Sequence, residues 1–300
     1  MEIRLETIEI AVAADEVRGT LLAPAAKLPG VLFVHGWGGS QAQDLERARE
    51  AAGLGCVCLT FDLRGHERHA ARWETVSRED NLQDLLAAYD RLLAEPHVDP
   101  AAIAVVGISY GGYLASILTT LRPVRWLALR SPALYMDEGW TMSKRQLHEA
   151  TDLHSYRRRI LPADENRALR ACADFLGDAL LVQSEFDETV PQQVIENYSA
   201  AFSGARSLTL RLLPGADHAL SNEDAQLGYR RVLIHWLTEM IVGAREAAAQ
   251  ARLDELPMDA RARTRVPTPP GTEEAHSGST SGCRPGSSAV RRSNTKQRPS

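Results

Sequence analysis

Short apolar runs recur along most of the chain, and their texture changes near residue 30. Residues 2–12 alternate between apolar and polar side chains, which is typical of a half-exposed antiparallel strand, and residues 17–23 suit a strand that pairs with it. The later runs are almost wholly apolar, as expected for strands of a parallel sheet that is buried on both faces. These later runs are residues 31–35, 56–61, 102–107, 124–130, 179–184 and 207–213.

Helical patterns separate these runs. Residues 79–95 carry leucines and a tyrosine at a spacing of three to four, and Ser77 with Asp80 forms a capping-box pattern at their start. A long last helix is predicted over about residues 222–248. Strands that alternate with helices in this way indicate an α/β fold with a mostly parallel sheet.

Composition narrows the class of protein. The chain has 300 residues, of which 44% are hydrophobic, so one large domain with a packed core is possible. The formal net charge of −5 argues against nucleic acid as the main partner of the folded part. Neither a signal peptide nor a membrane-spanning apolar run is visible, so we expect a cytoplasmic protein without a membrane partner.

The cysteines give no sign of a structural metal or of a disulfide framework. No pair has the spacing of a metal site, and we expect neither a metal nor an organic cofactor. The four cysteines are Cys56, Cys58, Cys172 and Cys283.

The end of the chain differs from the rest. Residues 257–300 are rich in Arg, Ser, Thr, Gly and Pro, and basic residues outnumber acidic ones there. Such a segment has too few apolar residues to offset its ordering entropy, so we predict a disordered basic tail after a folded domain over residues 1–250. An extension without a role is favoured over a segment that contacts nucleic acid or membrane.

One short motif carries most of the chemical information. Ser109 lies in a G-x-S-x-G pattern between the apolar run at 103–106 and a helix-compatible run at 113–118. A serine at such a strand-to-helix turn presents its hydroxyl at the sheet edge. The helix start places backbone N–H groups beside the hydroxyl, where an oxyanion would form.

Three further loops follow apolar strands in an informative order. A glycine loop at residues 35–39 precedes Ser109 by about 70 residues. Asp187 follows the run at 179–184, and His218 follows the run at 207–213. The order along the chain is therefore serine, aspartate, histidine, each just after a strand.

With these motifs the sequence resembles the α/β-hydrolase superfamily over about residues 1–248. Within it, the glycine loop and the Ser109 motif are similar to those of small esterases, dienelactone hydrolases and prolyl oligopeptidase catalytic domains. Dienelactone hydrolases proper have a cysteine nucleophile, and prolyl oligopeptidases have an N-terminal propeller. Because this chain has Ser109 and only about 100 residues before it, a single-domain esterase is favoured.

The resemblance implies an eight-stranded, mostly parallel sheet with helices on both faces. It also implies a short lid over the active site, at the insertion of residues 135–176. The lid should line the substrate pocket. Within it, residues 157–159 read Arg-Arg-Arg, and a solvated face is favoured over a site for an acidic substrate.

The candidate catalytic residues are Ser109 as nucleophile, His218 as base and Asp187 as the acid that orients the histidine. Rivals for the acid are Glu185, Glu188 and Asp217.

The resemblance assigns the oxyanion donors to the backbone N–H groups of Trp37 and Tyr110. A shift of one residue toward Gly38 or Gly39 stays open for the first donor.

Two neighbouring features have structural interpretations. His35 is expected to support the glycine loop. The turn from Asp62 to Glu67 reads Asp-Leu-Arg-Gly-His-Glu, where related hydrolases usually carry a last glycine, so we expect a structural turn with local distortion at Glu67.

The predicted function is hydrolysis of a small carboxylic ester or thioester through an acyl-enzyme. A peptidase acting on small peptides is the alternative within the same fold, and a non-catalytic binding protein is the alternative outside enzymes. The oligomeric state stays open.

Overall fold

The computed structural model describes residues 3–12, 15–24 and 27–255. The chain divides into two units, Met1–Gln250 and Ala251–Ser300, and both the main sheet and the candidate site belong to the first. The predicted tail over residues 257–300 lies outside the described residues. Of the four cysteines, the three in the described part are free, and Cys283 lies outside it.

Strands and helices alternate from β3 onward, as the apolar runs predict. The strands are β1 (Ile3–Val12), β2 (Asp15–Pro24), β3 (Leu28–Val34), β4 (Val57–Thr60), β5 (Val98–Ile108), β6 (Trp126–Arg130), β7 (Asp178–Phe186) and β8 (Ser207–Asp217). The helices are α1 (Leu45–Gly53), α2 (Arg78–Leu93), α3 (Tyr110–Leu118), α4 (Lys144–Ala150), α5 (Leu153–Tyr156), α6 (Arg167–Ala173), α7 (Gln192–Ala201) and α8 (Glu223–Glu255).

Six strands form one wholly parallel sheet in the order β4-β3-β5-β6-β7-β8. The prediction of eight strands in this sheet needs correction, because β1 and β2 pair antiparallel with each other as a separate two-stranded sheet. Alternating apolar residues identify a half-exposed strand, but they do not specify which neighbour satisfies its backbone hydrogen bonds.

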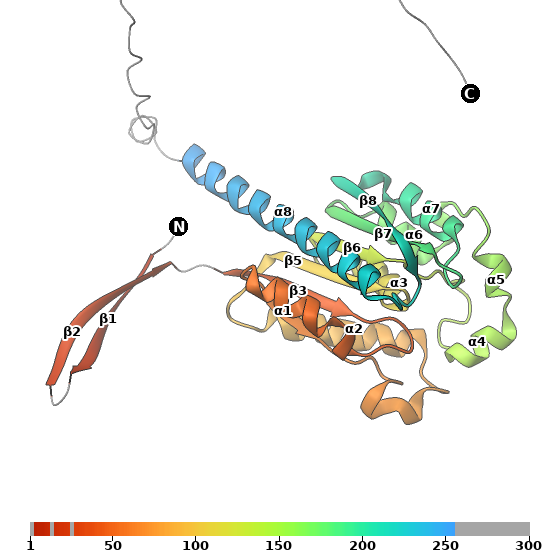
Figure 1. Cartoon of the computed structure of the whole chain (residues 1–300), viewed down its shortest axis with the longest axis horizontal. Coiled ribbons are helices and arrows are strands. Elements are labelled where there is room, and N and C mark those ends of the chain that lie inside the picture. Colours follow the sequence, from red (N-terminus) through yellow and green to blue (C-terminus); the bar gives the residue numbers. More distant parts are fainter. Residues whose placement is uncertain (1–2, 13–14, 25–26, 256–300) are drawn as a thin grey trace, which may run out of the picture. The chain divides into compact units, whose positions relative to one another are not determined.

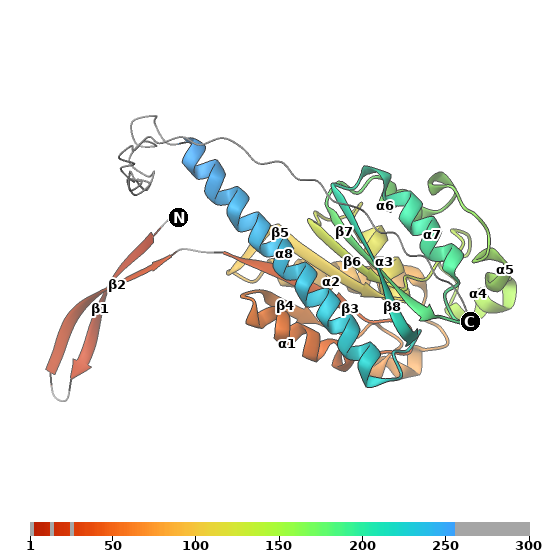
Figure 2. The ribbon, with the colours of Figure 1, turned by 45° about the horizontal axis from the view of Figure 1, so that its top comes forward.

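Helices cover both faces of the six-stranded sheet (Figures 1 and 2). Along β3, Leu32 and Val34 pack into a cluster with α2, α3, α6 and α7, whereas Val31 and Phe33 pack into a second cluster with α1 and α8. Each central strand is therefore buried on both sides, which explains the continuous apolar runs.

Helix boundaries follow local signals where those signals exist. Ser77 caps α2: its side chain accepts from the backbone N–H of Asp80, and the Asp80 carboxylate accepts from Ser77, as the capping box predicts. The last helix, α8, ends at Glu255, later than the predicted residue 248.

The strand order reverses between β3 and β5. After β3 the chain adds β4 on one side of the sheet, and β5 to β8 then follow on the other side. In open α/β sheets the crevice at the carboxyl ends of the strands beside such a switch point is where ligands bind. The glycine loop follows β3 and Ser109 follows β5, so both lie at this position.

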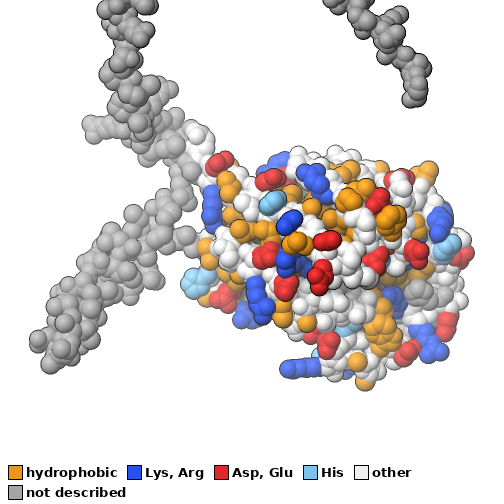
Figure 3. All heavy atoms as spheres, in the orientation of Figure 1, with side chains coloured by type: hydrophobic (Ala, Val, Ile, Leu, Met, Phe, Trp, Pro, Cys, Tyr) orange, Lys and Arg blue, Asp and Glu red, His pale blue; other side chains and the backbone are white. Residues whose placement is uncertain are grey.

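Basic and acidic side chains are interspersed with apolar ones over the face seen in Figure 3. In the described part of the chain, no helix combines the length and the apolar character that crossing a bilayer requires.

The turn after β4 carries the expected distortion. Gly65 has a φ of +89°, and a Cβ on it would come within 2.6 Å of a Val76 methyl group. Glu67, at the position of the missing glycine, has a φ of 44° and is exposed. A non-glycine residue in this region strains the backbone by about 1–2 kcal/mol.

We expect Glu67→Gly to raise the melting temperature by about 1–3 °C, because the strain is removed while glycine loses some conformational entropy on folding. Thermal unfolding followed by circular dichroism measures the change. Glu67→Ala keeps the Cβ and should leave the melting temperature nearly unchanged. An equal gain from both variants would assign the effect to the lost carboxylate instead.

Candidate active site

The turn at Ser109 depends on close packing between a helix and two strands. Ser109 has a φ of 51° between the end of β5 and the start of α3. A Cβ on Gly111 would collide with the carbonyl oxygens of Val34 and His35, and one on Gly107 would come within 2.6 Å of the helix backbone. Neither Gly107 nor Gly111 has a positive φ, so the motif needs these glycines for space rather than for backbone freedom.

The three candidate catalytic residues meet at the carboxyl ends of β5, β7 and β8. His218 Nε2 lies 3.0 Å from Ser109 Oγ, and His218 Nδ1 lies 2.8 Å from an Asp187 carboxylate oxygen. In such a hydrogen-bonded series the imidazole can accept the proton of the hydroxyl, and the carboxylate stabilises the resulting imidazolium.

Asp187 is the carboxylate that faces the histidine. Its side chain is 4% exposed. Its other oxygen accepts backbone N–H groups of Thr189 and Val190. Burial by itself would raise the pKa of Asp187, but hydrogen bonds from His218 and Val190 outweigh it and lower the pKa. The carboxylate is therefore ionised near neutral pH.

Two of the rival acids are engaged elsewhere. The Asp217 carboxylate accepts from the backbone and the hydroxyl of Ser221, at the turn before α8. Glu185 accepts the backbone N–H of Gly215 and is exposed. Neither contact directs a carboxylate to His218.

Two amides of the glycine loop after β3 are engaged in hydrogen bonds that hold the loop. The N–H of Gly38 donates to His66 Nε2 at 3.0 Å, and the N–H of Gly39 donates to the Gly36 carbonyl at 3.0 Å. Within the described residues the N–H of Trp37 has no such partner. The N–H groups of Gly38 and Gly39, the two alternative oxyanion donors, therefore already have acceptors.

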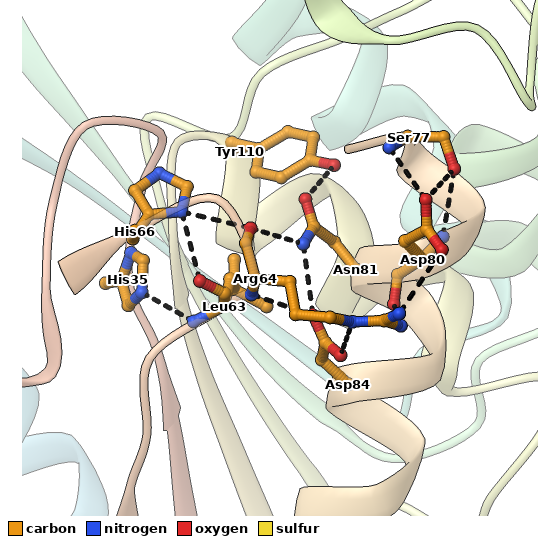
Figure 4. Close-up of polar contacts among 9 residues, drawn as sticks. All are labelled: His35, Leu63, Arg64, His66, Ser77, Asp80, Asn81, Asp84 and Tyr110. Atoms are coloured by element: carbon orange, nitrogen blue, oxygen red, sulfur yellow. Dashed lines mark hydrogen bonds and ion pairs between the residues drawn. The ribbon is translucent and has the colours of Figure 1, made fainter. Parts of the chain in front are cut away.

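His66 holds this loop, a role that sequence reasoning missed. Its Nδ1 faces the carbonyls of Leu63 and Arg64 (Figure 4). Nδ1 therefore carries the hydrogen, and Nε2 accepts from the N–H of Gly38. Burial, and then the neighbouring His35, lower the pKa of His66, so the ring is neutral near pH 7. His35 is structural, as expected: its Nε2 accepts the backbone N–H of Leu63.

Asn81 on α2 joins this turn to the Ser109 motif. It is fully buried, accepts from the Tyr110 hydroxyl at 3.0 Å and donates to the Arg64 carbonyl at 3.0 Å (Figure 4). Arg64 in turn pairs with Asp84 on the same helix. The turn at 62–67 is thus structural, as predicted, and it fixes the residue that follows Ser109.

Arg130, at the end of β6, is a second residue that the sequence did not reveal. It is 4% exposed and donates to the His218 carbonyl at 2.9 Å and to the Ser184 hydroxyl at 3.2 Å. Its guanidinium lies 5.6 Å from the ring centroid of Tyr229 on α8. The periodicity of apolar residues in the sequence does not indicate that a single arginine at the end of an apolar strand is buried.

The insertion between β6 and β7 contains α4, α5 and α6. The preference for a solvated face at residues 157–159 is wrong for Arg157, which is buried and donates to the carbonyls of Leu134 and Thr189. Arg158 and Arg159 are exposed. Three consecutive helical-turn positions point in different directions, so a run of one residue type need not share one environment.

The fold is similar to those of solved hydrolases. It is similar to a dienelactone hydrolase from Anabaena variabilis, with a TM-score of 0.51 and 19% identity over 80% of this chain and 99% of that one. It is also similar to the acylaminoacyl peptidase of Pyrococcus horikoshii, with a TM-score of 0.54 and 16% identity over 80% of this chain and 42% of that one.

A closer assignment comes from the sequence itself. Residues 46–243 match the prolyl oligopeptidase family, and the chain belongs to this family of hydrolases. A relative in Mycobacterium tuberculosis strain H37Rv, uncharacterized protein Rv2307c, is 29% identical over 218 residues, which are 71% of each chain.

Asp187→Asn should lower the turnover number of a hydrolysed ester by about 10³–10⁴, because the amide leaves the His218 ring in the wrong tautomer. Asp217→Asn is the matched control, since its carboxylate serves only the Ser221 turn. Initial rates with p-nitrophenyl butyrate measure both, with circular dichroism to show that each variant is folded. An equal loss in Asp217→Asn would transfer the role to that residue.

Arg130→Met should reduce the turnover number about tenfold with little change in KM, because the His218 backbone loses a buried donor. Arg130→Lys, which keeps one cationic donor, should recover part of the rate. If KM rose and the turnover number stayed constant, Arg130 would not position His218.

Proposed function

We propose that this protein is a serine hydrolase that cleaves a small carboxylic ester or thioester through an acyl-enzyme. The observation that carries the proposal is the continuous chain of hydrogen bonds from Ser109 through His218 to Asp187. Membership of the prolyl oligopeptidase family supports the same chemistry.

In the proposed first step, Ser109 Oγ attacks the substrate carbonyl while His218 Nε2 takes the hydroxyl proton. The C–O or C–S bond to the leaving group then breaks, and His218 returns the proton to that group. Water attacks the acyl-enzyme in the same way, with His218 again as base, and the acid leaves with Ser109 restored.

The negative charge on the carbonyl oxygen would be stabilised by backbone N–H groups of Trp37 and Tyr110. Among the described residues the Trp37 amide has no hydrogen-bond partner, whereas those of Gly38 and Gly39 do, and Tyr110 is the first residue of α3. An N–H group at the start of a helix has no partner within the helix, and the helix dipole favours an anion there. No metal or organic cofactor takes part in the proposed reaction.

A second candidate function is hydrolysis of small peptides. The family match favours it, because the matched family is that of prolyl oligopeptidases. The same proposed residues would serve, with an amine as the leaving group. Comparison of p-nitrophenyl butyrate with an aminoacyl p-nitroanilide separates the two functions.

The third candidate, a binding protein without activity, is disfavoured by the strained backbone at Ser109. A positive φ at a non-glycine residue persists only where surrounding packing imposes it, and such strain gathers at functional sites. Labelling by an organophosphonate, which modifies an activated serine, separates this candidate from both enzymes.

Ser109→Ala and His218→Ala should each reduce ester turnover by several orders of magnitude, and the double variant by little more, because the two side chains act as one unit. A panel of p-nitrophenyl esters and one aminoacyl p-nitroanilide, assayed with wild type and both variants, provides the measurement. If Ser109→Ala kept about a tenth of the wild-type rate, Ser109 would not be the nucleophile.

A further inference from the structure

A cavity lies beside the glycine loop, against the insertion. Its volume is about 470 Å³, and the residues that line it are Trp37, Trp73, Glu74, Lys144, Arg145 and Glu149. The ring of Trp37 packs against Trp73 at 4.5 Å and against Tyr110 at 5.5 Å between ring centroids. The cavity is therefore lined by Trp37, one of the two residues whose amides are the proposed oxyanion donors, and the Trp37 ring contacts the other, Tyr110.

Lys144, the first residue of α4, places a cation at this cavity. Its Nζ lies 4.3 Å from the ring centroid of Trp37 and 5.8 Å from that of Tyr110. In the part of the chain that the structure describes, it forms no ion pair with a carboxylate. The two acidic residues of the cavity, Glu74 and Glu149, both bind Arg145 and are more than half exposed.

Two buried arginines near the insertion, Arg78 and Arg157, form no ion pair with a carboxylate of the described residues. Arg78 is 3% exposed and donates to the carbonyls of Met136 and Glu138, and its buried Nε has no partner among the described residues. Arg157 likewise donates to backbone carbonyls. Neutral acceptors do not cancel a charge, so these two guanidinium groups contribute positive potential beneath the insertion.

The nearby carboxylates have hydrogen-bond partners other than Lys144. Asp187 faces His218 and two backbone N–H groups, and Asp137 accepts the backbone N–H of Arg167. Lys144 thus lines the cavity and contacts the aromatic rings of Trp37 and Tyr110. Among the described residues it has no anionic partner.

We propose that Lys144 binds an anionic group, a carboxylate in the simplest case, on the substrate that Ser109 attacks. This inference rests on the proposed function and narrows its substrate class to esters or thioesters that carry a negative charge near the scissile carbonyl. A carboxylate beside Lys144 would form a charge-assisted hydrogen bond, while Trp37 and Trp73 would pack against the adjoining apolar part.

The competing explanation is that Lys144 only fastens α4 to the glycine loop through its cation–π contacts. Fastening would affect charged and neutral substrates alike. The diagnostic quantity is therefore the ratio of kcat/KM for an anionic ester to kcat/KM for its neutral isostere.

Two substrate pairs place the charge on either side of the scissile bond. The mono-p-nitrophenyl ester of adipate is compared with p-nitrophenyl hexanoate, and the butyrate ester of 4-hydroxybenzoate with that of 4-hydroxybenzamide. We expect the wild type to favour the anionic member of at least one pair about tenfold, and Lys144→Met to remove that preference. Lys144→Arg should retain part of it.

Arg158→Met is the matched control, because Arg158 is an exposed arginine of the same insertion that only donates to the His154 carbonyl. It removes one positive charge without touching the cavity, so the ratio should stay within about twofold of wild type. An unchanged ratio in Lys144→Met, or an equal fall in Arg158→Met, would overturn the proposal.

The wild type gives a second measurement that needs no variant. Burial, and then Arg157, lower the pKa of Lys144 to about 7. The cationic form that an anion needs is thus present below pH 7 and is lost above it. The ratio should therefore fall between about pH 6 and pH 9, and a flat ratio would contradict the role of Lys144.

Among the described groups near Lys144, His66 has a lowered pKa and is uncharged from about pH 7 upward, so it does not reproduce a fall of the ratio above pH 7. The substrate carboxylate is ionised throughout the range. The other charged groups near Lys144 are Glu74, Arg145, Glu149 and Arg157.

Binding separates this inference from the proposed function. Calorimetry should show that the Ser109→Ala variant binds the adipate monoester with a lower Kd than the hexanoate ester. Adding Lys144→Met to this variant should abolish the difference in Kd. If no ester is hydrolysed but this preference is present, the proposed function fails and the anion site stands. If esters are hydrolysed and the preference is absent, the anion site fails alone.

Discussion

The close approach of α3 to the ends of β3 and β5 is the constraint on which the site depends. Because Gly107 and Gly111 have no Cβ, the first turn of the helix reaches the carbonyls at the end of β3. The chain must then turn sharply at Ser109, whose φ of 51° is the backbone consequence. A larger side chain at either glycine would move the helix start, the Ser109 hydroxyl and the Tyr110 amide together.

Around this turn, the remaining parts of the site are fixed by residues that take no part in the proposed chemistry. Asn81 binds the Tyr110 side chain, His66 binds the glycine loop, and Arg130 binds the backbone of His218. Each is buried, and each connects segments that are distant in the sequence. Parallel strands bring their carboxyl ends to one edge, but these polar contacts set the angles and distances there.

The insertion adds a charge pattern to this geometry. Arg78 and Arg157 satisfy backbone carbonyls beneath it, and Lys144 contacts aromatic faces. Hydrogen bonds to carbonyls compensate much of the desolvation of a guanidinium but leave its charge in place. Of these three cations Lys144 is the one that lines the adjoining cavity, and the proposed anion site depends on it.

The sequence by itself determined the alternation of strands and helices, the α2 cap and the loops that carry Ser109, Asp187 and His218. These depend on local periodicity, capping and turn residues, which short segments encode. Only the tertiary structure decided that β1 and β2 form their own sheet, that Arg157 is buried, and that Arg130 donates to the His218 carbonyl. Hydrogen-bond partners and burial depend on segments far apart in the chain, so no local pattern of residues can specify them.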